Sequence, residues 1–270
     1  MKFTSMAALA FAALALPQAQ AASSDIAAHT WDQVLQGSWR APENSVRDTY
    51  RHPRETLTFF GLKANQKVIE ITPGGGWYSE VLAPLLKDHG QYIAALQAPA
   101  SGDYFKKAAA GLKQKFAADP ARYAKATSVE FDPKAPRFGA PNSVDSVFTF
   151  RNVHNWVMAD TAPAMFKGFY SVLKHGGTLG VVDHRGKPGE SVDEIKQSGY
   201  LPTDYVIKLA TDAGFKLAGQ SEVNANARDT KDYPQGVWTL PPVLREGDKD
   251  RAKYVAIGES DRMTLRFVKP

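Results

Sequence analysis

Two groups of residues in this chain have the types and spacing needed for chemistry on a bound small molecule. In the first group, an apolar run that contains Glu70 leads into three consecutive glycines, Gly74, Gly75 and Gly76. A strand that turns through glycines into a helix lets the backbone lie flat against a nucleotide, because no side chain holds the ligand away. The segment therefore predicts a nucleotide-type binding site with a carboxylate beside it.

The second group consists of polar residues that follow two later apolar runs. Asn152 and His154 follow the run at residues 144–150, and His184 follows the run at residues 178–182. Ligands of open α/β sheets bind at the carboxyl ends of the strands, where these residues are expected to lie. Histidine has an ordinary pKa near 6.5 and can accept a proton from a reacting group, so His154 and His184 are the candidate catalytic bases.

Each of these assignments competes with a plainer one. Glycines also close ordinary turns, His154 can pack against Trp156 at the start of a helix, and His184 can be a solvated loop residue. Binding of a metal by His154, Asp183 and His184 is a further alternative, but the three lack the tight spacing of a metal-binding motif. We therefore assign no metal to the site.

The apolar runs alternate with helical patterns along most of the chain. Helical, mostly polar sequence precedes the first run, and Gly61 is expected to end the last of these N-terminal helices. Strands are predicted at residues 68–70, 90–96, 128–131, 143–150, 178–182, 215–223 and 263–268. Helical segments separate the first six strands, which predicts a Rossmann-like, doubly wound α/β sheet of seven strands. No helix lies between the final two strands, so the last strand is predicted to be antiparallel.

Short motifs occur along this pattern in a recognisable order. The acidic residue and glycine turn at residues 70–76 are followed by Val-Asp-Ser-Val-Phe-Thr-Phe from residue 144, Leu-Lys-His-Gly-Gly-Thr-Leu from residue 173 and Asp-Ala-Gly-Phe from residue 212. In this order, residues 48–270 resemble the class I S-adenosylmethionine (SAM) dependent methyltransferases. The helix Arg-His-Pro-Arg-Glu-Thr-Leu at residues 51–57 is similar to one in a group of exported bacterial predicted methyltransferases.

The resemblance implies that SAM is the cofactor, and it indicates the residues that would hold it. Glu70 would orient the glycine turn and face the methionine amino group, and Asp132 would lie near the adenine amino group. The full set of expected cofactor-binding residues is Glu70, Thr72, Gly74, Gly75, Gly76, Gln97, Asp132 and Asn152. The implied activity is methyl transfer to a small-molecule acceptor.

The sequence departs from the resemblance at Gln97, where an acidic residue would bind the cofactor ribose. An amide loses the charge-assisted grip of a carboxylate. An exported protein that kept the fold but only binds a nucleotide or metabolite is therefore the alternative function. A site for NAD is less consistent, because its G-x-G-x-x-G pattern requires a glycine where Ser79 stands.

The N-terminus has the three parts of a secretory signal peptide. Lys2 is followed by an apolar stretch at residues 6–16 and by the small-x-small triplet that ends at Ala21. The apolar stretch is shorter than the roughly 20 residues that span a bilayer, so no stable membrane insertion is expected after cleavage. We predict a signal peptide at residues 1–21, a helical cap at residues 22–62, a methyltransferase-like domain at residues 63–270, and a periplasmic or secreted location.

Composition narrows the remaining possibilities. The chain has no cysteine, which excludes disulfides, zinc-thiolate sites and cysteine nucleophiles. Its net charge is +5, but the basic residues are scattered, so no nucleic-acid partner is expected. The long connection at residues 224–262 is expected to cover the site together with the N-terminal helices. Four aromatic residues are the candidates for its walls: Trp77, Tyr78, Tyr233 and Trp238.

Overall fold

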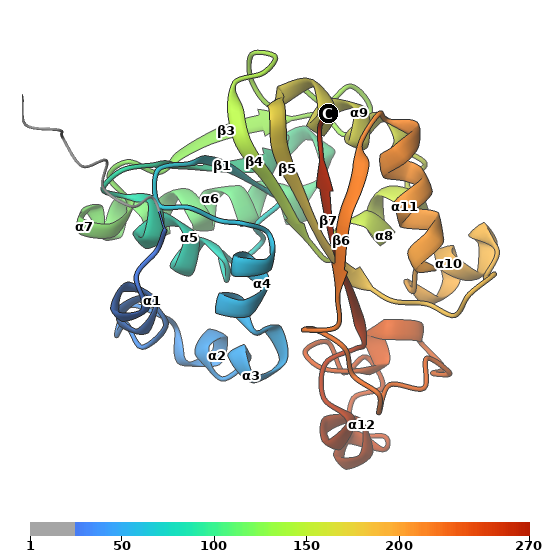
Figure 1. Ribbon diagram of the computed structural model, residues 1–270. Coiled ribbons are helices and arrows are strands. Elements are labelled where there is room, and N and C mark those ends of the chain that lie inside the picture. The colour runs from blue at the N-terminus through green and yellow to red at the C-terminus, as the bar shows by residue number, and fades with distance from the viewer. Residues whose placement is uncertain (1–24) are drawn as a thin grey trace, which may run out of the picture.

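Seven strands form one sheet in the order β3-β2-β1-β4-β5-β7-β6 in the computed structural model, which describes residues 25–270 (Figure 1). The strands are β1 (Lys67–Ile71), β2 (Gln91–Gln97), β3 (Thr127–Phe131), β4 (Val144–Phe150), β5 (Leu173–His184), β6 (Lys216–Ser221) and β7 (Arg262–Val268). Neighbouring strands from β3 to β5 pair in parallel, whereas β7 is antiparallel to both β5 and β6. The predicted doubly wound, Rossmann-like sheet with an antiparallel last strand is confirmed.

Helices cover both faces of this sheet (Figure 1). Before and beside the first strands lie α1 (Ala28–Leu35), α2 (Pro42–Ser45), α3 (Asp48–Arg51), α4 (Pro53–Phe59), α5 (Ser79–Leu86), η1 (Pro99–Ser101), α6 (Asp103–Ala118) and α7 (Pro120–Tyr123). The later elements are α8 (Val153–Met158), α9 (Ala162–Val172), α10 (Val192–Ser198), α11 (Thr203–Asp212), η2 (Gly236–Thr239) and α12 (Arg251–Ile257).

The alternation of side chains along the central strands creates two hydrophobic cores. Successive strand residues point to opposite faces, so Val147 and Phe148 of β4 enter different cores. The core that contains Val147 is closed by α8, α9, α10 and α11. The core that contains Phe148 is closed by α1, α4, α5, α6 and α7. Burial on both faces explains why the strands read as continuous apolar runs in the sequence.

Several boundaries differ from the sequence-based expectation. β5 begins at Leu173 instead of Thr178, because the segment expected as a turn already pairs with β4 at Val144. The sequence also suggests Thr203 as the N-cap of a helix, but Pro202 holds that position and Thr203 is the first residue of α11. The short helices α8, α10 and α12 were not predicted, because six or seven residues show too little helical periodicity to be recognised.

The predicted signal peptide, residues 1–21, lies outside the described residues. Among residues 25–270, the structure contains no helix with the length and apolar character needed to cross a bilayer.

Candidate functional site

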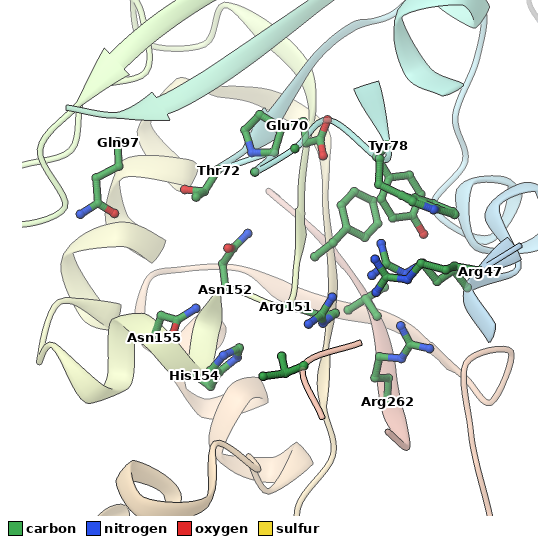
Figure 2. Close-up of a pocket in the computed structure, with 18 of the residues that line it drawn as sticks. Arg47, Glu70, Thr72, Tyr78, Gln97, Arg151, Asn152, His154, Asn155 and Arg262 are labelled. Carbon is green, nitrogen blue, oxygen red and sulfur yellow. The ribbon is translucent and has the colours of Figure 1, made fainter. Parts of the chain in front are cut away.

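A cavity of about 530 Å³ lies at the carboxyl ends of β1, β2 and β4 (Figure 2). Its volume is in the range of small-molecule sites. The N-terminal helices contribute Asn44, Arg47 and Arg51 to its lining, and the connection between β6 and β7 contributes Asn224 and Trp238. The prediction that these two segments cover the site is therefore confirmed, and Figure 1 shows α2–α4 and the segment with α12 at the same end of the sheet.

The glycine turn after β1 forms one wall of the cavity. Gly74 and Gly75 line it, and a Cβ atom added to either glycine would meet no heavy atom within 4 Å. Gly76 has a different role, because its added Cβ would lie 2.8 Å from Cδ1 of Leu112 in α6. Its φ of +84° also favours glycine. Thus two glycines open the backbone toward a ligand, and the third allows α6 to pack against the turn.

Thr72, at the base of this turn, has an unusual conformation. Its φ is +49°, which is rare for a β-branched residue. Its backbone N–H donates to the carbonyl of Ala95 at 2.8 Å. The Oγ1 atom is buried and has no hydrogen-bond partner within residues 25–270. An unpaired buried hydroxyl on a strained residue at a cavity wall is a reasonable contact for a ligand.

Glu70 lies buried beside the turn, with 3% of its surface exposed. Its Oε2 atom accepts hydrogen bonds from the Tyr92 hydroxyl at 2.5 Å and from the Ser79 hydroxyl at 3.3 Å. Burial raises the pKa of Glu70 to about 7, although both hydrogen bonds act in the opposite direction. Oε1 has no hydrogen-bond partner in the described part of the chain, and Glu70 lines the cavity.

The remaining expected cofactor residues divide between the cavity and the surface. Gln97 lies at the end of β2 and lines the cavity beside Phe105. Asn152 lines it too, and its Nδ2 atom donates to the carbonyl of Ile71 at 2.9 Å, which ties the ends of β1 and β4 together. Asp132 does not line the cavity: it is exposed, and its Oδ1 atom accepts from the backbone N–H of Lys134 at 2.9 Å. The turn role that competes with adenine binding is the one seen here.

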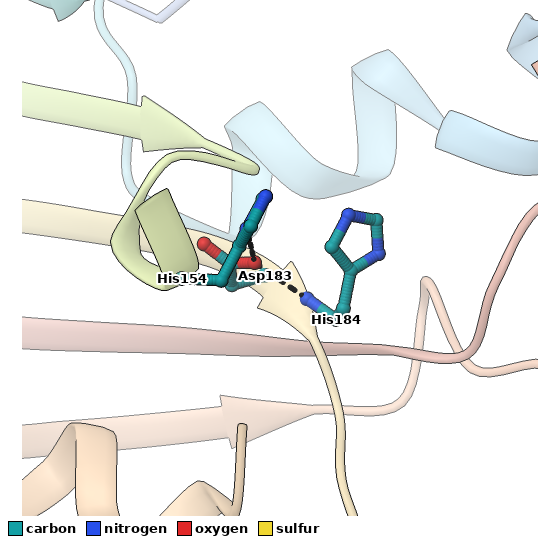
Figure 3. A group of neighbouring side chains, drawn as sticks. All are labelled: His154, Asp183 and His184. Atoms are coloured by element: carbon teal, nitrogen blue, oxygen red, sulfur yellow. Dashed lines mark hydrogen bonds and ion pairs between the residues drawn. The ribbon is translucent and has the colours of Figure 1, made fainter. Parts of the chain in front are cut away.

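His154, at the start of α8, faces the cavity with one ring nitrogen held by a carboxylate (Figures 2 and 3). Its Nδ1 atom lies 2.8 Å from Oδ1 of Asp183. Asp183 also accepts from the backbone N–H groups of Val153 at 2.7 Å and His184 at 2.8 Å. A carboxylate accepts hydrogen bonds, so Nδ1 of His154 donates to Asp183. In the neutral imidazole the lone pair is then on Nε2, which has no hydrogen-bond partner within residues 25–270.

His184, the other candidate catalytic base, does not line the cavity with His154. It is 4% exposed, and its Nδ1 atom lies 2.5 Å from the hydroxyl of Ser260. Burial, His154 and nearby arginines lower the pKa of His184 well below its ordinary value. A neutral His184 can accept a hydrogen bond at Nε2, and Nε of Arg151 lies 3.5 Å from this atom.

His154, Asp183 and His184 lie close enough together to be considered as ligands of a metal ion (Figure 3). One ligand atom from each of His154, Asp183 and His184 lies within 4.8 Å of the others. However, hydrogen bonds from His154 and two backbone N–H groups already occupy Asp183, and Arg151 donates to His184. Hydrogen bonding explains the arrangement, and a cation would have to bind beside a guanidinium.

Four arginines line the cavity together, and the sequence did not assign a role to any of them. This arginine cluster consists of Arg47, Arg51, Arg151 and Arg262. Glu259 is their shared counter-ion: its carboxylate lies 2.6 Å from Nε of Arg47, 3.3 Å from Nε of Arg51 and 2.9 Å from Nη1 of Arg262. The only local signals for the cluster were the motif that begins at Arg51 and the position of Arg151 directly after β4.

The cluster changes the acidity of its own members. Burial acts to raise the pKa of Glu259, but the charges of the four arginines outweigh it and lower this pKa to about 2. Burial and the neighbouring arginines lower the pKa of Arg51 to about 10, even though Glu259 acts to raise it. A pKa of about 10 still leaves the Arg51 guanidinium charged at neutral pH.

Aromatic rings form much of the remaining wall. Trp77, Tyr78 and Trp238 line the cavity as expected, whereas Tyr233 does not and instead packs at right angles to Tyr254. The ring of Tyr78 stacks on Phe150 with centroids 3.5 Å apart. The cavity thus combines an open glycine turn, a histidine with a free lone pair, a cationic region and apolar walls.

Comparisons with known proteins show which fold carries this arrangement. No protein-family profile matches the chain, and no curated protein matches its sequence. A SAM-dependent methyltransferase from Aquifex aeolicus superposes with a TM-score of 0.54 and 15% identity, covering 86% of this chain and 95% of that one. The glycopeptide N-methyltransferase MtfA gives a TM-score of 0.52 and 15% identity, covering 85% of this chain and 100% of that one.

A third similar structure belongs to a protein named for another reaction. The [4+2]-cyclase SpnF superposes with a TM-score of 0.59 and 15% identity, covering 87% of this chain and 86% of that one. Similarity at this level establishes the fold and does not by itself establish the reaction. The chain has the Rossmann-like fold of SAM-dependent methyltransferases.

Proposed function

We propose that this protein is a SAM-dependent methyltransferase that acts on a small-molecule acceptor. The main supporting observation is the open glycine turn: Gly74 and Gly75 face the cavity with free space where any side chain would begin. The unpaired Oγ1 atom of Thr72 and the free Oε1 atom of Glu70 lie beside this turn, so polar contacts for a ligand are available within the described structure.

These residues fit the parts of SAM in a consistent order. Glu70 would accept hydrogen bonds from the methionine ammonium group, the backbone at Gly74 and Gly75 would contact the adenosyl part, and Gln97 would bind the ribose by neutral hydrogen bonds. When bound, the cofactor supplies a methyl group on a positively charged sulfur. The chain has to position the acceptor about 3 Å from that methyl group and remove a proton where the acceptor atom carries one.

His154 is the residue best placed to accept such a proton. Asp183 holds its Nδ1–H, so the lone pair of Nε2 is directed away from Asp183 in a ring that lines the cavity. Asp183 would also stabilise the imidazolium ion after proton transfer. His184 is assigned no catalytic role in this proposal, because it does not line the cavity.

We also propose that the protein is exported, as in the group of exported bacterial predicted methyltransferases that it resembles. The support is the sequence of residues 1–21, with Lys2, an apolar stretch and a small-x-small triplet. Expression with a C-terminal tag, followed by cell fractionation and mass determination, tests this proposal. Cleavage after Ala21 and recovery outside the cytoplasm are expected, whereas an uncleaved chain in the cytoplasm would contradict export.

Calorimetric titration with SAM, S-adenosylhomocysteine (SAH) and NAD tests the cofactor assignment. Wild-type protein is expected to bind SAM and SAH, and Gly75→Ala is expected to weaken SAH binding at least tenfold because its methyl group enters the ligand's space. Gly111→Ala is the matched control, since the added Cβ also meets no atom within 4 Å but lies outside the cavity lining. Absence of SAM and SAH binding, or equal affinities for the two variants, would overturn the assignment.

Incubation of the protein with labelled SAM and cell extracts separates transfer from binding alone. A labelled small molecule that depends on the protein supports catalysis. Binding of SAH without any labelled product would instead support the alternative of an exported protein that binds a nucleotide and no longer transfers a methyl group.

A further inference from the structure

The arginine cluster brings more positive charge to the cavity than the surrounding residues neutralise. Glu259 forms ion pairs with Arg47, Arg51 and Arg262, but Arg151 has no ion pair within residues 25–270. Two other carboxylates lie near the cluster. Asp183 is occupied by His154 and by backbone N–H groups, and Glu70 lines the cavity with a pKa that burial raises to about 7. Among residues 25–270, Glu259 is thus the only carboxylate that forms ion pairs with the cluster, which is a costly arrangement in a largely buried site unless a ligand completes it.

Several donors of the cluster have no acceptor. Nε of Arg262 and Nη2 of Arg47 are buried without a hydrogen-bond partner in the described structure, and Arg262 is only 3% exposed. The terminal nitrogens of Arg51 and Arg151 also have no hydrogen-bond acceptor among residues 25–270, although the Arg51 guanidinium lies over the ring of Trp77. Buried donors are nearly always paired in proteins, and guanidinium groups pair best with the oxygens of carboxylates and phosphates.

A purely structural role does not account for Arg151. Its backbone is in the left-handed region, with φ of +63°, and its Nε atom lies beside neutral His184 instead of a carboxylate. Arg151 is half-buried, and a partly buried cation without a direct ion pair adds little to the stability of the fold. Its retention at the cavity wall is explained if it contacts a bound anion.

The cluster lies apart from the end of β2, where Gln97 is expected to bind the ribose. Figure 2 shows Arg47, Arg151 and Arg262 on the side of the cavity opposite Gln97. SAM has a single carboxylate group, and one or two guanidinium groups suffice to bind it in bidentate fashion. The cluster provides four, which leaves donors for a second anionic group.

We infer that the acceptor substrate is a small organic anion whose carboxylate or phosphate group binds in the arginine cluster. This inference rests on the proposed function and specifies its substrate class. The apolar part of the acceptor would contact the rings of Tyr78, Phe150 and Trp238, which line the same cavity. An anion held by several arginines positions the rest of the acceptor for proton transfer to His154.

Calorimetric titration of the SAH-saturated protein with benzoate, phenyl phosphate and neutral benzamide tests the inference. Wild-type protein is expected to bind at least one of the two anions and to discriminate against benzamide by tenfold or more. Preference for benzoate or for phenyl phosphate identifies the anionic group. Binding of neither anion, or equal affinity for benzamide, would overturn the inference.

Two variants identify the residues responsible. Arg151→Gln and Arg262→Gln are expected to weaken anion binding at least tenfold while the affinity for SAH changes less than twofold. Arg54→Gln is the matched control, because Arg54 pairs with Asp32 at the surface and does not line the cavity. Unchanged anion affinity in both cluster variants contradicts the inference, and an equal loss of SAH affinity would assign the arginines to the cofactor carboxylate.

Thermal denaturation distinguishes a binding role from a structural one. Since Arg151 has no ion pair, Arg151→Gln is expected to keep or raise the midpoint of unfolding while it weakens anion binding. A lower midpoint would show that Arg151 stabilises the fold, against the inference. Anion binding to a protein that does not bind SAH would contradict the proposed methyltransferase function and leave the anion site intact. SAH binding without anion binding would contradict only the inference about the substrate.

Discussion

Replacement of Glu259 by glutamine is the most informative single change in the arginine cluster. Glu259 is 4% exposed and accepts from Nε of Arg47, Nε of Arg51 and Nη1 of Arg262. Glutamine has nearly the same size and resembles the protonated carboxyl group. Glu259→Gln therefore removes the negative charge while the packing is preserved, and four guanidinium groups remain without a counter-ion.

The size of the effect follows from the acidity of Glu259. Its pKa is lowered from 4.5 to about 2, a difference that corresponds to roughly 3 kcal/mol of stabilisation of the charged form by folding. Breaking a buried ion pair by removal of one partner costs roughly 3–5 kcal/mol in other proteins, which agrees with this value. For a chain of this size, the melting temperature of Glu259→Gln is expected to fall by about 7–14 °C at pH 7.

The pH dependence gives the prediction its sign. Because the folded-state pKa is lower than the unfolded-state value, the stabilisation is complete above about pH 5 and is lost as the pH falls toward 2. The difference in unfolding free energy between wild type and Glu259→Gln should decrease to roughly 1 kcal/mol at pH 3. This difference is measured by urea denaturation of both proteins between pH 7 and pH 3, with circular dichroism as the signal.

Glu222→Gln is the control, because the Glu222 side chain is 71% exposed and pairs with Arg185 at the surface. Exposed pairs contribute less than about 1 kcal/mol, so this variant should remain close to wild type. The electrostatic explanation would be refuted if Glu259→Gln lowers the free energy of unfolding by less than about 1 kcal/mol at pH 7, or if the decrease is the same at every pH.

Three further predictions concern the turn and the histidine. Burial raises the pKa of Glu70 from 4.5 to about 7, so the folded protein becomes less stable as the pH rises through this interval and Glu70 loses its proton. Glu70→Gln should therefore be up to about 3 kcal/mol more stable than wild type at pH 8 and equally stable near pH 4, as measured by urea denaturation. His154→Gln should reduce the rate of methyl transfer from labelled SAM roughly 10²- to 10⁴-fold with less than twofold change in SAH affinity, and a smaller decrease than fivefold would exclude it as the base. Gly76→Ala should lose at least about 1–2 kcal/mol in urea denaturation, because its φ is +84° and the new methyl group would lie 2.8 Å from Leu112; wild-type stability would contradict the packing role assigned to this glycine.

Much of the fold was predictable because its signals are local. The buried parallel strands are continuous apolar runs, and the helices between them have a clear helical period, so the order of elements follows from the sequence. The glycine turn and Glu70 lie within seven residues, and their relation is determined by one strand and its following turn. Short helices such as α8 and α12 were missed because they span fewer than two full turns.

The roles of the two histidines were not predictable in the same way. His154 and His184 both follow strands that end at the same edge of the sheet. Ser260, just before β7, lies against His184, and His154 remains at the cavity wall. Both histidines are buried, and the contact of His184 is made with a residue 76 positions further along the chain, so no local pattern shows which histidine lines the cavity.

By itself, the sequence determined the sheet, the open turn after its first strand and the polar residues at its carboxyl edge, since each depends on neighbouring residues. Only the tertiary structure decided that residues from 47 to 262 form one cationic cavity around Glu259. The physical reason is that electrostatic interactions depend on distance in space and on burial. Scattered arginines that read as ordinary surface charge in a sequence therefore become the lining of one cavity when folding brings them together and partly buries them.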